Sequence, residues 1–186
     1  MIKFQITYKS SFCYQWPKIK IYNNGNFIKE VECNNEKFEF TFVPAEKNNL
    51  VLDWFNKSEK HTKIQNGKIV EDQSIEILNL RIDDIQVESW MLTDTHYEPR
   101  YFRGFIKQHQ DKNIVLETKL KSQLIWHFPG KFVFQEFPQN FWDFYFQKKQ
   151  DKEVINFLDK DPDRIHKFRG SLDPCLDIVL QLKKLI

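Results

Sequence analysis

The sequence predicts a mainly β protein: an antiparallel β-sandwich of the jelly-roll type over residues 1–137, with a helical C-terminal extension over residues 138–186 packed on it. Three observations lead to this prediction. Apolar and polar residues alternate in short segments, turn-forming residues separate these segments, and the spacing becomes helical after Pro138. About seven short strands within the first half of the chain are typical of a sandwich or jelly roll.

The first strands are predicted from alternation at period two. Residues 2–8 place Ile, Phe, Ile and Tyr on one face, which is the pattern of a half-buried strand. A second strand follows Trp16-Pro17 and carries two inward isoleucines over residues 18–22. Asn24-Gly25 tolerates the positive φ angles of a type I′ turn, which predicts a hairpin into Asn26–Glu32.

Three further features continue the sheet pattern. Residues 37–42 place three phenylalanines on one face of a strand that ends before Pro44. Leu50–Phe55 is apolar on both faces, as an interior strand would be. Asn66-Gly67 predicts a second hairpin, between His61–Ile64 and Lys68–Val70.

The segment SIEILNLRIDDIQVE changes the parity of its apolar residues. Ile75 and Ile77 stand at odd positions, Leu78 to Ile82 continue at even ones, and Ile85 returns to odd. A strand cannot change parity without an extra residue or burial of both faces. We therefore expect a β-bulge, or a crossing between sheets, near Leu78-Asn79.

Four more strands are predicted before the helical part. They cover Arg100–Gln108, Asn113–Leu120, Leu124–Phe128 and Lys131–Phe137, with a turn at Pro129-Gly130 between the last two. After Pro138, Asn140 can cap a helix. A second helix begins at Asp173-Pro174, and its apolar stripe from Leu172 to Ile186 is expected to lie against the sandwich or a partner.

The composition of the chain argues against several classes of function. Net charge is +2, and the 28 basic residues are mostly Lys, so the basic, arginine-rich surface of a nucleic-acid-binding protein is not expected. No apolar run is long enough for a membrane span, so no membrane partner is expected. The three cysteines are scattered, which favours free, inert thiols over a disulfide framework or a nucleophile.

No catalytic signature is recognised, so the protein is not expected to be an enzyme. The five glycines are too dispersed for a phosphate-binding loop, and no zinc spacing or Gly-x-Ser-x-Gly elbow is present. His96, Glu98 and Arg100 would share one face if extended, although a solvated loop before a strand is the favoured interpretation. Asp83 and Asp84 point to opposite faces in a strand, which excludes a simple carboxylate dyad.

The segment NLRIDDIQV (Asn79–Val87) resembles the closing strand of calcium-dependent carbohydrate-binding modules with a jelly-roll fold. In those modules an earlier strand ends in an aromatic residue followed by Asn-Asp, whose side chains help to hold the metal. Phe55-Asn56-Lys57 is the comparable place here, with Lys57 in the position of the acid. The resemblance implies Asn56 and, in a shifted register, Asp72 as metal ligands. Asp83 is a third candidate, since calcium takes several oxygen ligands, so calcium is an option where no other cofactor is expected.

The whole chain also resembles small uncharacterised proteins of large tailed phages, particularly those of marine cyanobacteria. The similarity lies in WPKIKIYNNG, RIDDI and PGKFVFQEFPQNFWDFY. It implies a structural or decoration protein of the virion, made in the host cytoplasm, that binds neighbouring virion proteins in a larger assembly. The alternative is a carbohydrate-binding or adhesin module that binds a glycan.

The segment Leu124–Gln147 contains ten aromatic residues among its 24. Phe132 and Phe134 share one face of a strand and are predicted to be core. On a helix from Asn140 the aromatic rings cover more than one apolar stripe. Trp142 and Phe146, together with Trp126, are therefore predicted to lie at a protein–protein contact, with full burial inside the chain as the alternative.

Overall fold

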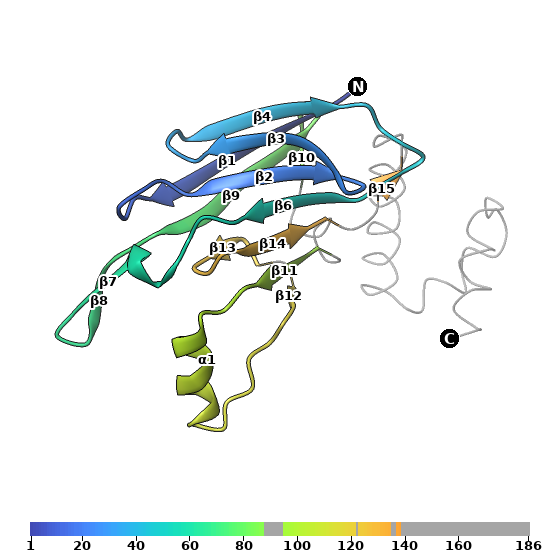
Figure 1. Cartoon of the computed structure of the whole chain (residues 1–186). Helices are drawn as coiled ribbons and strands as arrows, with labels where there is room; N and C mark the ends of the chain where they lie inside the picture. The colour runs from blue at the N-terminus through green and yellow to red at the C-terminus, as the bar shows by residue number, and fades with distance from the viewer. Residues whose placement is uncertain (88–94, 122, 135–136, 139–186) are drawn as a thin grey trace, which may run out of the picture. The chain divides into compact units, whose positions relative to one another are not determined.

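The computed structural model describes residues 1–87, 95–121, 123–134 and 137–138 (Figure 1). The chain divides into two units, residues 1–141 and 142–186, and every described residue lies in the first. The predicted helical extension lies outside the described residues from residue 139 on, as do Trp142, Phe146 and the stripe from Leu172 to Ile186, whereas its first residue, Pro138, pairs with Lys47 in a strand.

The described residues form an antiparallel β-sandwich, as the sequence predicts. One sheet has the strand order β10-β9-β1-β4, and β13 also pairs with β9. Its strands are β1 (Ile2–Ser11), β4 (Lys37–Phe42), β9 (Ser74–Ile82), β10 (Ile85–Gln86) and β13 (Ile125–Trp126).

The second sheet has six strands in the order β12-β11-β14-β6-β2-β3. They are β2 (Lys18–Asn23), β3 (Asn26–Glu32), β6 (Leu50–Trp54), β11 (His96–Pro99), β12 (Leu120–Lys121) and β14 (Gly130–Val133). Two small sheets complete the described part: β7 (Thr62–Gln65) with β8 (Lys68–Asp72), and β5 (Lys47–Asn48) with β15 (Phe137–Pro138).

The core lies between the two large sheets. The inward residues of β1, β4 and β9 are buried on one side, and those of β2, β6, β11 and β14 on the other. Phe4 of β1 stacks on Phe40 and Phe42 of β4, with ring centroids 5.2 and 5.7 Å apart, and meets Phe134 edge-on at 6.0 Å. Phe132 and Phe134 are buried, as predicted. Much of the phenylalanine content therefore serves inter-sheet packing.

Both Asn-Gly hairpins are confirmed. Asn24 and Gly25 have φ angles of 50° and 78°, and Asn66 and Gly67 have 52° and 73°. Positive φ at both central residues is the requirement of a type I′ turn. β6 is an interior strand, between β14 and β2, as its two-sided apolar character predicts.

The bulge predicted near Leu78-Asn79 is also confirmed. In the β1–β9 register Thr7 pairs with Asn79 and Tyr8 with Ile77, which leaves Leu78 as the extra residue. The second parity change has another cause. Asp83 and Asp84 are not strand residues: both have positive φ, and they form the turn between β9 and β10.

The predictions after residue 100 are less accurate. Residues 103–110 form α1 (Arg103–Gln110) instead of a strand. Phe105 and His109 are one helical turn apart and stack with ring centroids 4.0 Å apart, a contact that a strand would not allow. Asn113–Leu120 contains no strand before Leu120, and only Ile125 and Trp126 of the predicted strand Leu124–Phe128 are paired.

Gly130 does not serve the turn predicted for Pro129-Gly130. It is the first residue of β14 and pairs with Pro99. A Cβ atom at Gly130 would lie 2.5 Å from the carbonyl oxygen of Glu98 and 2.8 Å from the ring of Tyr97. The glycine therefore permits the close approach of β14 to β11.

Trp126 lies in the core and not at an exposed contact surface. Its side chain is fully buried, and its ring stacks on that of Tyr97 at 5.1 Å and packs against Phe132 at 5.3 Å. For Trp126, the alternative given above, full burial inside the chain, is therefore the one that the structure shows. Among the described residues, no helix is long and apolar enough to cross a membrane.

Candidate functional site

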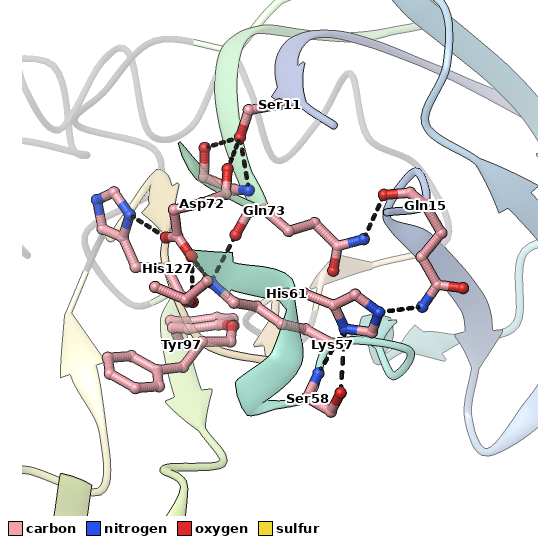
Figure 2. A network of polar contacts seen from close by, with 12 residues as sticks. Ser11, Gln15, Lys57, Ser58, His61, Asp72, Gln73, Tyr97 and His127 are labelled. Atoms are coloured by element: carbon pink, nitrogen blue, oxygen red, sulfur yellow. Dashed lines mark hydrogen bonds and ion pairs between the residues drawn. The ribbon is translucent and has the colours of Figure 1, made fainter. Parts of the chain in front are cut away.

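A buried polar network joins four chain segments at one end of the sandwich (Figure 2). We call these segments the loop end: residues 12–17 between β1 and β2, residues 55–61 with the 3-10 helix η1 (Glu59–His61), Gln73 between β8 and β9, and residues 127–129 between β13 and β14. They are distant in sequence, and side-chain hydrogen bonds join them in addition to a backbone hydrogen bond from Gln73 to the carbonyl oxygen of His61.

Lys57 is at the centre of the network. Its ammonium donates hydrogen bonds to the carboxylate of Asp72 and to the carbonyl oxygens of Gln73 and His127, each over 2.6 Å. Only 1% of the side chain is exposed, and Nζ lies 5.6 Å from the centre of the Trp54 ring. Burial lowers the pKa of Lys57, and the hydrogen bond and charge of Asp72 oppose that lowering.

Asp72 connects this buried charge to the surface. Its Oδ1 also accepts a hydrogen bond from the hydroxyl of Thr62, and its Oδ2 lies 3.6 Å from Nδ1 of the largely exposed His127. The residue after His127 is held as well, because the hydroxyl of the buried Tyr97 donates to the carbonyl oxygen of Phe128. A partly exposed carboxylate and an exposed imidazole therefore stand at the rim of a fixed framework.

His61 and Gln15 fix the neighbouring part of the loop end. The backbone N–H of Ser58 donates to Nδ1 of the buried His61 over 2.9 Å, and Nε2 of His61 lies 3.1 Å from the amide nitrogen of Gln15. The amide of Gln15 donates to the carbonyl oxygen of Asn56, and the side chain of Gln73 donates to the carbonyl oxygen of Gln15. Burial lowers the pKa of His61, and the nearby charges of Lys60 and Lys57 add to this effect.

These contacts determine how the segment 12–17 presents its aromatic rings. Cys13 and Gln15 form a bridge around Tyr14, which takes a φ of 65° at the tip. Cys13 is fully buried, whereas Tyr14 is 62% and Phe12 52% exposed. A non-glycine residue at positive φ is uncommon and needs support from its surroundings. The polar network supplies that support.

The exposed rings have defined neighbours. Phe12 meets the half-buried Trp16 edge-on, with centroids 5.2 Å apart. The ammonium of Lys63 lies 4.9 Å from the centre of the Tyr14 ring and pairs with Glu71 at 2.6 Å. Phe12 and Trp16 thus form one aromatic pair, and Tyr14, which lies between them in sequence, is exposed beside a lysine that can donate hydrogen bonds.

A second group of aromatic rings lies around Phe105 of α1. Phe105 packs on Tyr101 and Phe128, with centroids 5.6 and 4.6 Å apart. The backbone N–H of Gly104 donates to Glu59, which connects the start of α1 to η1. In contrast to Tyr14, each of these three rings is half-buried.

The residues predicted to bind a metal are not brought together. Both polar atoms of the Asn56 side chain are used in structural hydrogen bonds. Its Oδ1 accepts from the backbone N–H of Lys18 and from the Trp54 indole, and its amide nitrogen donates to the carbonyl oxygen of Trp16. Asp83 accepts from the backbone N–H of Lys3, near the start of β1. Asp72 lies at the other end of that strand, where its carbonyl oxygen accepts from Ser11.

At about 3.3 Å per residue, roughly 25 Å separates the two ends, so Asp72 and Asp83 cannot bind the same ion. Within the described ranges, no cluster of three or more His, Cys, Asp or Glu residues could hold a metal. The calcium that the resemblance implies does not fit at Asp72, because the Lys57 ammonium already lies 2.6 Å from its carboxylate.

His96, Glu98 and Arg100 are largely engaged in structural contacts. His96 lies 3.1 Å from Glu98 on the same face of β11, and Glu98 also pairs with Lys119. Arg100 donates to Asp53 and to the carbonyl oxygen of Trp54. The sequence analysis did not predict Lys57, Gln15, His61, Gln73 or Tyr14 as site residues. The one signal in the sequence that pointed to this network was Lys57 itself, which stands where the resemblance leads one to expect an acidic residue.

Comparison with known proteins gives two structural neighbours. No protein-family model and no curated protein matches the chain. A solved structure of vCBM60 in complex with galactobiose covers 73% of this chain and 99% of its own, with a TM-score of 0.47 and 4% identity. A second structure of vCBM60, described as linking two families of calcium-dependent carbohydrate-binding modules by circular permutation, has a TM-score of 0.42, 5% identity and coverage of 73% and 92%.

Proposed function

We propose that the loop end is a non-catalytic carbohydrate-binding surface, with the ring of Tyr14 as the platform for one sugar unit. The observation that carries the proposal is the exposure of Tyr14 and Phe12 on a loop that is fixed by partly buried hydrogen bonds to and from Gln15. Contiguous exposed apolar surface commonly marks a binding site in a folded protein.

The chemistry of the surface suits a sugar. The C–H groups on one face of a pyranose ring are apolar and pack on an aromatic ring, while its hydroxyl groups need hydrogen-bond partners at the edge. The ammonium of Lys63 provides hydrogen-bond donors beside the Tyr14 ring, and Asp72 and His127 are further polar groups at the rim of the network that holds the loop. Because the network already orders Tyr14, binding would lose little conformational entropy.

A glycan array with the purified full chain tests this proposal, and galactobiose, the sugar bound in one structural neighbour, is the first soluble ligand to titrate. Tyr14→Ala is expected to weaken the binding of any positive glycan about fivefold or more, if stacking of the sugar on the ring contributes about 1–3 kcal/mol, as stacking of a nucleobase on an aromatic ring does. Phe27→Ala is the matched control, because Phe27 is 58% exposed on the remote strand β3. Absence of any positive glycan, or equal binding by Tyr14→Ala, would contradict the proposal.

A contact with another protein is the second candidate, and one observation favours it. Ile64, Ile69 and Val70 are each more than half exposed on the β7–β8 hairpin. The role as a virion protein of a tailed phage stays a prediction. Mass spectrometry of purified particles would test it, and absence of the chain from them would count against it.

A further inference from the structure

The Lys57 ammonium has the surroundings of a bound metal cation. Three oxygens from two other segments lie 2.6 Å from it: one carboxylate oxygen of Asp72 and the carbonyl oxygen of the adjacent Gln73, and the carbonyl oxygen of His127. Carboxylate and carbonyl oxygens are also the ligands that hard cations take in proteins. An ammonium has three N–H donors, one for each of these oxygens.

The two carbonyl oxygens distinguish this arrangement from an ordinary ion pair. A lysine that served only to neutralise Asp72 would need one contact, and it could remain in solvent. Here only 1% of the side chain is exposed to solvent, and such burial is costly for a charge unless all its donors are satisfied. In return, one cation joins the segment after β6, the β8–β9 junction and the β13–β14 loop.

We propose that Lys57 takes the structural place of a metal cation: its ammonium cross-links the loop end, which consequently needs no metal to keep its shape. Shortening Lys57 would remove the ammonium and leave Asp72 and the two carbonyl oxygens as an open cation site. This inference does not depend on carbohydrate binding, because it concerns what holds the loops and not what they recognise.

The first test compares the wild-type chain with EDTA and with calcium chloride at matched ionic strength. The midpoint of thermal unfolding is expected to be the same in both solutions, because the cation that cross-links the loops is a side chain of the protein and neither EDTA nor calcium can remove it. A midpoint that falls in EDTA or rises in calcium would overturn the proposal. This test needs no variant, so it stands even if every Lys57 substitution prevents folding.

The second test uses Lys57→Ala. Removing one partner of a buried ion pair is strongly destabilising, so the midpoint is expected to fall by about 10 °C. Calcium chloride, but not sodium chloride of equal ionic strength, is expected to restore several degrees by binding the exposed oxygens. Lys57→Met is the matched control, because its side chain fills the space without a charge and leaves no room for an ion.

The two variants give opposite outcomes under the proposal. Recovery with calcium in Lys57→Ala alone supports it. Equal recovery in Lys57→Met, no recovery in Lys57→Ala, or wild-type stability in Lys57→Ala would overturn it. Lys63→Ala controls for loss of any lysine, since Lys63 pairs with Glu71 but is exposed. If Lys57→Ala does not fold in buffer, refolding yield from urea with and without calcium gives the same decision.

Discussion

At the scale of single residues, His61 couples the loop end to pH. The backbone N–H of Ser58 donates to Nδ1 of His61, so that atom has to remain without a proton. Burial lowers the pKa of His61 below its ordinary value of 6.5. The unfolded chain therefore binds the proton more readily than the folded chain does.

The sign of the pH dependence follows. This contribution of His61 to stability is fully present above pH 6.5 and is lost as the pH falls from there through the lowered pKa of the folded state. We expect the free energy of unfolding, measured in urea, to be smaller at about pH 5.5 than at about pH 7.5. In His61→Asn, whose amide oxygen can still accept from Ser58, the difference between the two pH values should shrink. An unchanged difference in that variant would show that other groups cause the pH dependence.

The same scale explains why the centre of the site is hard to predict from sequence. Two of the three oxygens around Lys57 belong to backbone carbonyls, which every residue has. Their arrival at one point depends on long-range strand pairing. Asp72 could be proposed as a site residue, but the partner of its carboxylate is a lysine close to Asn56 and not a metal shared with Asp83.

At the scale of elements, the bulge in β9 keeps the core residues of that strand on one face. Leu78 is 57% exposed and has no register partner in β1. Deleting it should turn Ile75 and Ile77 outward and destabilise the protein by more than about 4 kcal/mol, beyond the range of ordinary substitutions. Leu78→Thr keeps the extra residue and should change stability by no more than about 0.5 kcal/mol. The free energies of unfolding of the two variants, measured in urea, test this prediction. Similar values for the deletion and for Leu78→Thr would refute this role of the bulge.

The β11–β14 pairing depends on the missing side chain of Gly130. Gly130→Ala should cost about 1–3 kcal/mol, because the new methyl group would meet the backbone of β11 and the ring of Tyr97. Gly104→Ala, in α1, is the contrasting case. Its Cβ would lie 3.4 Å from the flexible end of Glu59, and alanine favours a helix by about 0.5–1 kcal/mol. If both variants are destabilised equally in urea, the close contact at Gly130 is not the cause.

Local signals predict most elements of the first 87 residues and are less accurate after residue 100, where β14 overlaps the predicted strand Lys131–Phe137 but α1 replaces a predicted strand, and the difference has a physical reason. The early strands are five to ten residues long in most cases, long enough for alternation to be visible, and two Asn-Gly turns mark their ends. Strands such as β12 and β13 have two residues each, too few to show a period. Around the start of α1, the rings of Tyr101 and Phe105 stand at alternating positions as in a strand, while the contact between Phe105 and His109 that indicates a helix lies further along the chain.

At the scale of the whole molecule, the two sheets are joined by aromatic packing. Phe4 is fully buried and contacts the rings of Phe40 and Phe42 in its own sheet and that of Phe134, which follows β14 in the other. A residue in this position stabilises both layers at once, whereas an exposed ring on an edge strand stabilises neither.

Phe4→Ala should therefore destabilise the protein by about 3–5 kcal/mol, the cost of a large cavity in a closely packed core. Phe27→Ala removes the same side chain from an exposed position on the edge strand β3 and should cost less than about 1 kcal/mol. Urea unfolding of the two variants measures the difference. Because both lose the same atoms, their unequal cost isolates the contribution of burial between the sheets. Equal costs would mean that Phe4 does not lie in a packed interior, and the sandwich itself would then be wrong.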